Sequence, residues 1–187
     1  MIKIIHMHKE KLYSLIYGCA GGLLAGISLG EELSLLMPFA LAFLWASSSC
    51  PSSGFVWGFL SILYSHKWIL ALHPLSWVGI PGPISLLVST LIWLFCGFLG
   101  GFLVWIWCLL LIRFFSYFIR NQIARIDFGV ALSFSIVWGL GEVWLAKGPL
   151  FWVGIGSSLL PGDVSLAGIA RFFGAGGIAS LQLLIGW

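Results

Sequence analysis

Residues 84–112 form a stretch without a single charged side chain, and this stretch constrains the fold more than any other feature of the sequence. A helix needs about 20 apolar residues to cross the roughly 30 Å hydrocarbon core of a bilayer, and this stretch exceeds that length. The whole chain has the same character, since 60% of its residues are hydrophobic and only 8% are charged. A soluble domain carries about 25% charged residues, because its surface must interact with water. The sequence therefore predicts an all-α integral membrane protein, whose backbone polar groups are satisfied within helices.

Dividing the chain at its charges, prolines and polar clusters gives six apolar segments. These predicted spans are approximately 12–30, 33–49, 54–72, 84–112, 128–146 and 164–187. The second is short and could tilt or form a tight hairpin with the first, whereas the fourth is long enough to tilt strongly or to extend beyond the hydrocarbon core. We therefore expect one domain, residues 1–187, that forms a bundle of about six transmembrane helices joined by irregular periplasmic loops.

The basic residues predict which helix ends face the cytoplasm. Six of the nine lie in the N-terminal segment and after the fourth span, at Lys3, Lys9, Lys11, Arg113, Arg120 and Arg125. An alternating six-span chain places both segments on one side, which the positive-inside rule assigns to the cytoplasm. The prediction is a multi-pass membrane protein with a cytoplasmic N-terminus, and in a bacterium this membrane would be the inner membrane. The 11 tryptophans fit this interpretation, because tryptophan collects at membrane–water interfaces.

The first span carries a glycine at every fourth position, at Gly18, Gly22, Gly26 and Gly30. One face of this helix is therefore bare backbone, and we expect another helix to pack closely against it. The four cysteines form no CxxC pair and have no histidine at ligand spacing, so we interpret them as packing residues without a metal or a disulfide. The sequence has no motif for a nucleotide, a metal or another cofactor, and no basic aromatic surface for nucleic acid.

Ionisable side chains within a span are costly unless they are paired or reach water, so each is a candidate for function. Lys67 can extend to the outer surface, and His73 begins an outer loop, where a capping or hydrated histidine is the simpler interpretation. Glu142 lies near the outer end of the fifth span, and Lys147 follows five residues later. A structural ion pair or an interfacial anchor and a lipid or substrate contact are all open, and Arg171 could neutralise Glu142 or bind a headgroup phosphate. All these groups fall in the outer half of the bilayer or at its outer surface.

Two longer segments carry a resemblance to a known family. The segment "SHKWILALHPLSWVGIPGPISLLVSTLIWLFCGFLGG" has a tryptophan-rich helix that exits into a loop with glycine and proline and returns as a long apolar helix. The segment "IVWGLGEVWLAKGPLFWVGIGSSLLPGDVSLAGIARFFGAGGIASL" follows it with a Glu–Trp–basic pattern, a Pro–aromatic–Trp turn and a glycine-rich helix. In this order they resemble bacterial apolipoprotein N-acyltransferases, over roughly residues 20–187. Val143 is inserted into the Glu–Trp–basic pattern and Lys147 is displaced, which weakens any role assigned to that pattern.

The resemblance implies an enzyme that transfers an acyl chain from a phospholipid to the N-terminal cysteine of a diacylated lipoprotein. In the family, a Glu–Lys–Cys triad resides in a nitrilase-like domain after these helices, and none of the four cysteines here occupies a matching motif. We therefore expect this chain to be a membrane part without catalytic residues, and to have no acyltransferase activity by itself. The apolar ending "LQLLIGW" favours a chain cut short, with the catalytic domain encoded separately or lost. The candidate contacts for phospholipid or diacylglyceryl groups are His73, Trp77, Glu142, Trp144, Lys147, Trp152 and Arg171.

Two other functions fit the size of the chain. The small-molecule-binding subunit of a vitamin transporter is also a six-span protein, and its first span could use the glycine face to dock a partner helix. Against this alternative, no polar pocket at the middle of the membrane is legible in the sequence. A non-catalytic assembly protein or an evolutionary remnant is the remaining alternative.

Overall fold

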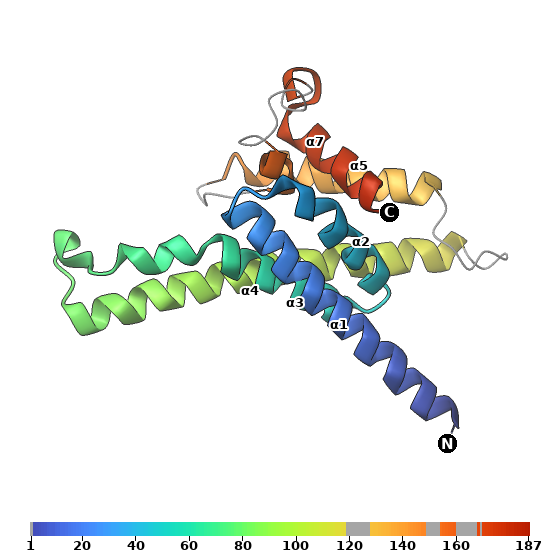
Figure 1. The fold of residues 1–187 in the computed structure, drawn as a ribbon, viewed down its shortest axis with the longest axis horizontal. Coiled ribbons are helices and arrows are strands. Elements are labelled where there is room, and N and C mark those ends of the chain that lie inside the picture. The colour runs from blue at the N-terminus through green and yellow to red at the C-terminus, as the bar shows by residue number, and fades with distance from the viewer. Residues whose placement is uncertain (1, 119–127, 149–153, 160–167, 169) are drawn as a thin grey trace.

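The computed structural model of the chain describes residues 2–118, 128–148, 154–159, 168 and 170–187. Over these residues the chain forms helices and turns, without a β-strand (Figure 1). The predicted all-α membrane fold is therefore confirmed.

The α-helices are α1 (Ile2–Gly30), α2 (Met37–Ser47), α3 (Pro51–Ser65), α4 (Gly82–Phe118), α5 (Phe128–Leu145) and α7 (Ala170–Gly186). Short 3₁₀ helices lie between them, at η1 (Ser34–Leu36), η2 (Lys67–Leu72), η3 (Leu75–Val78) and η5 (Ile155–Leu159). Prolines start two of the α-helices, since Pro38 and Pro51 occupy the first turn of α2 and α3. Proline is well placed there because its missing N–H would have no partner within the helix.

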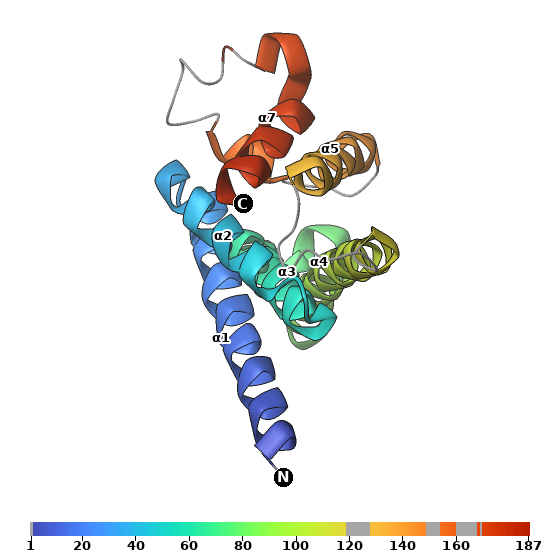
Figure 2. The same cartoon turned by 90° about the vertical axis from the view of Figure 1, so that its right-hand side faces the viewer.

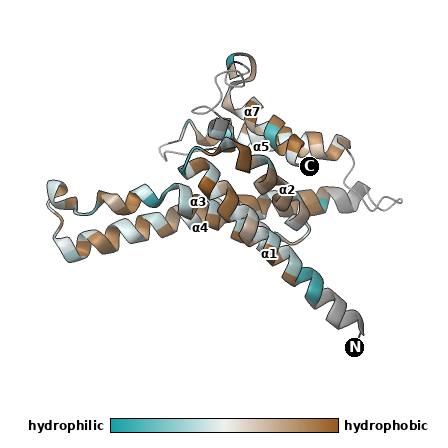
Figure 3. Cartoon of the chain, viewed as in Figure 1, coloured by the Kyte–Doolittle hydropathy of each residue, from teal (hydrophilic) through white to brown (hydrophobic). Residues whose placement is uncertain are grey.

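Three helical stretches are long and apolar enough to cross a membrane, namely Lys9–Gly30, Gly82–Phe114 and Phe128–Leu145. They coincide with the first, fourth and fifth predicted spans, and Figure 3 colours the ribbon by hydropathy along them. The apolar helices over Ser34–Ser47 and Ala170–Gly186 are shorter and match the second and sixth predicted spans. The count of six spans stays a prediction.

The third predicted span, 54–72, differs from one continuous α-helix. The α-helical part ends at Ser65, because His66 leaves helical geometry with φ −101° and ψ 16°, and the chain continues as η2. A second break lies inside α7 at Gly174, whose φ of 64° is in the left-handed region. Glycine adopts this conformation readily because it has no Cβ.

The helices form two groups that meet through α2 and η5. In the first group, α3 lies between α1 and α4, and α2 packs on α1 (Figures 1 and 2). In the second group, α5 packs on α7, and Figure 2 shows this pair above the first group. The contacts of α2 with α7 and of η5 with α1 join the groups, whereas α4 and α5 touch only sparsely.

Glycines allow α1 and α3 to approach until their backbones touch. The glycines of α1 that face α3 most closely are Gly18, Gly22 and Gly26. A Cβ at Gly18 would lie 2.5 Å from the carbonyl oxygen of Ser53, and a Cβ at Gly22 would lie equally close to that of Trp57. In lipid the hydrophobic effect does not drive helices together, because the lipid tails are as apolar as the helices. Close approach of this kind instead stabilises the helix pair through van der Waals contact.

Three tryptophans fill the interior of the bundle. The residues Trp45, Trp57 and Trp107 are 7%, 2% and 5% exposed. The indole N–H of Trp45 donates to the carbonyl of Leu183 at 2.8 Å, and that of Trp57 donates to Ala40 at 3.0 Å, while Trp107 donates to a carbonyl of α5. These three tryptophans therefore face the interior of the bundle and not lipid, because each indole finds its acceptor inside the protein.

Candidate functional site

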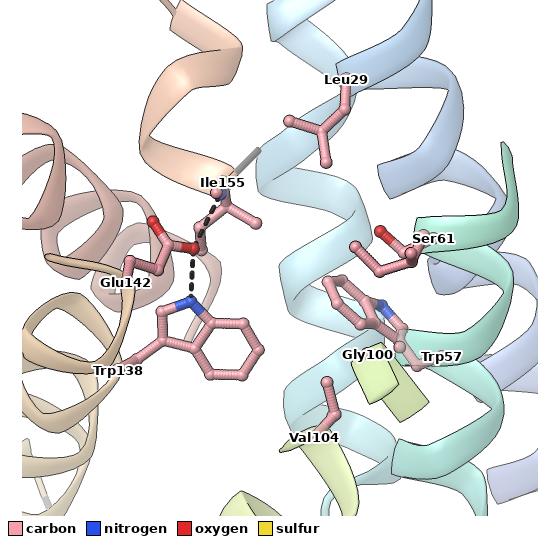
Figure 4. Close-up of a pocket in the computed structure, with 11 residues that line it drawn as sticks. Leu29, Trp57, Ser61, Gly100, Val104, Trp138, Glu142 and Ile155 are labelled. Atoms are coloured by element: carbon pink, nitrogen blue, oxygen red, sulfur yellow. Dashed lines mark hydrogen bonds between the residues drawn. The ribbon is translucent and has the colours of Figure 1, made fainter. Parts of the chain in front are cut away.

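Glu142 places a carboxylate in the interior of the bundle, where the residue is only 7% exposed. Its Oε1 accepts hydrogen bonds from the indole N–H of Trp138 at 2.9 Å and from the backbone N–H of Ile155 at 2.8 Å (Figure 4). Its Oε2 accepts a third, from the backbone N–H of Gly156 at 3.3 Å. The two backbone donors begin η5, so the carboxylate stands at the start of this 3₁₀ helix and ties it to α5. Three donors that converge on one side chain hold η5 against α5.

A small cavity lies beside this carboxylate. Its volume is about 20 Å³, and its walls include Leu29 of α1, Trp57 of α3, Val104 of α4 and Trp138 of α5 (Figure 4). A cavity of this size has room for about one water molecule. It is too small for any part of a lipid.

A larger groove separates α4 from α5, where the two helices touch only sparsely. Its volume is about 260 Å³, and its walls include Leu103 and Trp107 from α4 and Val137 and Gly141 from α5. Glu142 also borders it. The groove is apolar over nearly its whole wall, which suits a hydrocarbon chain better than a polar ligand.

The C-terminal end of α5 and the start of α7 carry three further predicted contacts in exposed positions. Trp144 is 75% exposed, and the side chains of Lys147 and Arg171 are exposed as well. Neither cation pairs with Glu142, whose hydrogen bonds within the described part of the chain are the three from Trp138 and η5. Of the alternatives for Glu142 and Lys147, the ion pair is therefore not formed.

The remaining predicted contacts lie elsewhere. His73 follows η2, and its Nδ1 is 3.0 Å from the hydroxyl of Ser85 in the first turn of α4. Trp77 lies in η3 and is 74% exposed. Figure 1 shows η3 at the far left end of the molecule, away from α5 and α7, so the structure does not bring these two residues together with Glu142. Trp152 lies outside the described residues.

The donors to Glu142 were not predicted from the sequence. Trp138 precedes it by four residues, which places the two side chains on the same helix face, so this partner was legible in the spacing. The sequence could not single out the backbone N–H groups of Ile155 and Gly156 as donors, because almost every residue has a backbone N–H. Among the described residues, no three His, Cys, Asp or Glu side chains lie close enough together to hold a metal ion.

The curated relatives of the chain share one name. A protein of Prochlorococcus marinus (strain MIT 9313), named apolipoprotein N-acyltransferase, is 49% identical over 181 residues, which are 97% of this chain and 36% of that protein. Proteins of the same name from a second strain of Prochlorococcus marinus and from Parasynechococcus marenigrum (strain WH8102) are 45% and 43% identical. Those matches cover 98% and 92% of this chain, and 37% and 36% of the two relatives. The chain belongs to the apolipoprotein N-acyltransferase family.

The chain spans little more than a third of the length of these acyltransferases and matches their N-terminal portion. The family resemblance predicted from the two quoted segments is therefore confirmed. The larger part of each relative has no counterpart in this sequence. No protein-family model and no solved structure matches the chain.

Proposed function

We propose that the chain is the membrane domain of an apolipoprotein N-acyltransferase, the enzyme that transfers an acyl chain from a phospholipid to the N-terminal cysteine of a lipoprotein. The observation that carries this proposal is the 49% identity over nearly the entire chain with a protein of that name. In this role the helices anchor the enzyme and form the entrance through which its lipid substrates reach it.

The lipid contacts of this entrance are best assigned to the C-terminal end of α5 and the start of α7. Trp144 suits the membrane–water interface, where an amphipathic ring has both a wet and an apolar neighbour. The exposed cations Lys147 and Arg171 suit a lipid phosphate. The apolar groove between α4 and α5 lies nearby and suits an acyl chain. Glu142 has a different role in this proposal, because its carboxylate is already occupied by the donors that hold η5.

The proposed activity requires more than this chain. We expect no N-acylated product when the purified chain is incubated with phospholipid and a diacylated lipopeptide, since none of its four free cysteines occupies a motif that matches the family's triad. The product is measured by mass spectrometry against an empty-membrane control. Joining the chain to the portion of the Prochlorococcus marinus (strain MIT 9313) relative outside the match is expected to give product. Product from the chain alone, or none from the joined protein, would contradict the proposal.

The proposed localisation is the bacterial inner membrane with the N-terminus in the cytoplasm. It is supported by the exposed Lys9 and Lys11 at the start of the first membrane-spanning stretch and by Arg113 near the end of the α4 stretch. Single cysteines at the N-terminus and in the segment after Arg113 are expected to resist a membrane-impermeant thiol reagent added to intact cells. A cysteine in place of Leu35, in η1, is expected to react at once. The reverse pattern of reactivity would refute the orientation.

A further inference from the structure

The groove between α4 and α5 is nearly as long as one leaflet of a bilayer is deep. Its volume is about 260 Å³, and its wall on α5 extends from Val137 to Leu145. The eight steps from residue 137 to residue 145 rise about 12 Å at 1.5 Å per residue, and one leaflet supplies about half of a hydrocarbon core of roughly 30 Å. One end of the groove, at Leu145, lies beside the exposed Trp144 and close to the exposed Lys147. A lipid whose headgroup lies at this end can therefore extend an acyl chain along the groove.

The polar side chains at the wall of the groove already have partners within the protein. The indole N–H of Trp107 donates to the carbonyl of Phe134 at 3.3 Å, and that of Trp138 donates to Oε1 of Glu142 at 2.9 Å. The carboxylate of Glu142 also accepts from the backbone of η5. A polar ligand in the groove would lose its hydrogen bonds with water and gain few in return, which is unfavourable. A hydrocarbon chain has no such loss, so the wall suits an acyl chain and not a polar molecule.

Two tryptophans give the groove a concave wall. The rings of Trp107 and Trp138 meet edge to face, with centroids 5.5 Å apart and an angle of 85° between their planes. Trp107 is only 5% exposed, and Val104 in the same wall is 4% exposed. The lipid-facing Phe98 of the same helix is instead 55% exposed and lies outside the groove. A concave apolar wall of this kind is typical of a ligand site.

Gly141 keeps the groove open at its middle. A Cβ at this position would have no neighbour within 4 Å. Gly58 and Gly139 differ from it, because a Cβ at either would collide with the backbone of the facing helix. Glycine is an unfavourable residue within a helix, so close helix packing explains its use at Gly58 and Gly139. At Gly141 no helix approaches, and the space that the missing side chain leaves belongs to the groove.

We propose that Gly141 determines which acyl chains the groove accepts and is thus a specificity residue for the phospholipid donor. This inference rests on the proposed function and names the site that the donor's chain would occupy. Residues 137, 141 and 145 lie four apart and share one face of α5, with Gly141 midway along the groove. A larger side chain at Gly141 would divide the groove and leave about 6 Å of it next to Leu145. Short chains would still fit into that part, whereas long chains would not.

Photolabelling of the purified chain tests this inference. The probe is a phosphatidylethanolamine with a diazirine at the end of one hexadecanoyl chain, added to the protein in detergent micelles at increasing mole fraction. Peptide mass spectrometry measures labelling at Val137, which lines the groove at the far end from Leu145, and at Phe98 as the reference for general lipid contact. We expect labelling at Val137 to saturate, while labelling at Phe98 rises in proportion to the probe. Proportional labelling at both residues would mean general lipid contact only and would overturn the inference.

Gly141→Leu is the variant that fills the groove, and Gly82→Leu is its matched control. A Cβ at Gly82 also has no neighbour within 4 Å, but Gly82 starts α4 and does not border the groove. We expect Gly141→Leu to lower the saturable labelling at Val137 by roughly tenfold, because a few methylene groups in a hydrophobic pocket discriminate to that extent. Gly141→Ala should give a smaller loss, and Gly82→Leu should leave the labelling unchanged. Saturable labelling that survives in Gly141→Leu, or that is lost equally in Gly82→Leu, would contradict the role of Gly141.

Activity distinguishes the failure of this inference from the failure of the proposed function. The chain is joined to the portion of the Prochlorococcus marinus (strain MIT 9313) relative outside the match, and N-acylation of a diacylated lipopeptide is measured with dihexadecanoyl and dioctanoyl phosphatidylethanolamine. We expect Gly141→Leu to lower the ratio of the long-chain rate to the short-chain rate by roughly tenfold, whereas Gly82→Leu should not change this ratio. An unchanged ratio in an active joined protein would refute the specificity role of Gly141 alone. Groove labelling that depends on Gly141, without any N-acylated product, would instead refute the proposed function and leave the groove as a lipid site.

Discussion

Replacing Glu142 with alanine is expected to be among the most damaging single substitutions in the chain. The indole N–H of Trp138 and the backbone N–H groups of Ile155 and Gly156 would lose their acceptor together. A buried donor left without a partner costs about 1–3 kcal/mol, so we expect a loss of roughly 2–4 kcal/mol in the free energy of unfolding, allowing for partial relaxation. The measurement is denaturant-induced unfolding of the purified chain in detergent micelles, followed by tryptophan fluorescence.

Glu142→Gln is the matched control for this prediction. Its amide oxygen can still accept from Trp138 and Ile155, but its amide nitrogen would face the N–H of Gly156, which is also a donor. We therefore expect Gln to lie between the native protein and Ala in stability. Cleavage between Lys147 and η5 by added protease should increase in the same order, because η5 is released from α5. If Glu142→Ala unfolds at the same denaturant concentration as the native protein, the Glu142 side chain does not hold η5.

The helices could be predicted from the sequence because the bilayer imposes so simple a rule. The spans 12–30, 84–112 and 128–146 fall on α1, α4 and α5, since a long apolar stretch has one stable backbone conformation in lipid. The 54–72 stretch was less predictable. Its apolar residues continue past Ser65, yet the α-helix stops there and η2 folds back on α4. Composition therefore did not locate the end of this α-helix.

The surroundings of the candidate residues were harder to predict than the helices. The residue type alone does not indicate whether a histidine or a tryptophan faces lipid, water or another helix. Trp57 and Trp77 show this, since one is 2% exposed and hydrogen-bonded to α2, whereas the other is 74% exposed in η3. Which state each adopts depends on helix crossings, and those depend on glycines whose partners lie far away in the sequence. The spacing of four between Trp138 and Glu142 was local and could have been used.

The crossing of α5 and α7 carries the second large prediction. Gly139 and Gly176 meet there, and a Cβ at Gly139 would collide with the backbone carbonyl oxygen of Gly176 and the hydroxyl of Ser180. In the other direction, a Cβ at Gly176 would lie 2.5 Å from the carbonyl oxygen of Gly139. Backbone atoms cannot move aside as a side chain does, so Gly139→Ala should force the helices apart at a cost of about 1–3 kcal/mol. Gly139→Val should cost more, and unfolding in detergent measures both.

Gly141 supplies a control on the same helix, two residues farther along. A Cβ at Gly141 would have no neighbour within 4 Å, because it points into the open groove between α4 and α5. Gly141→Ala should therefore be neutral or stabilising by up to about 1 kcal/mol, as expected when alanine replaces glycine within a helix. The two alanine variants have the same composition, so a difference between their unfolding free energies reports the helix crossing itself. Equal unfolding free energies for the two variants would mean that α5 and α7 do not touch at Gly139. The contact of α7 with α2 would then not explain how α5 is held in the bundle.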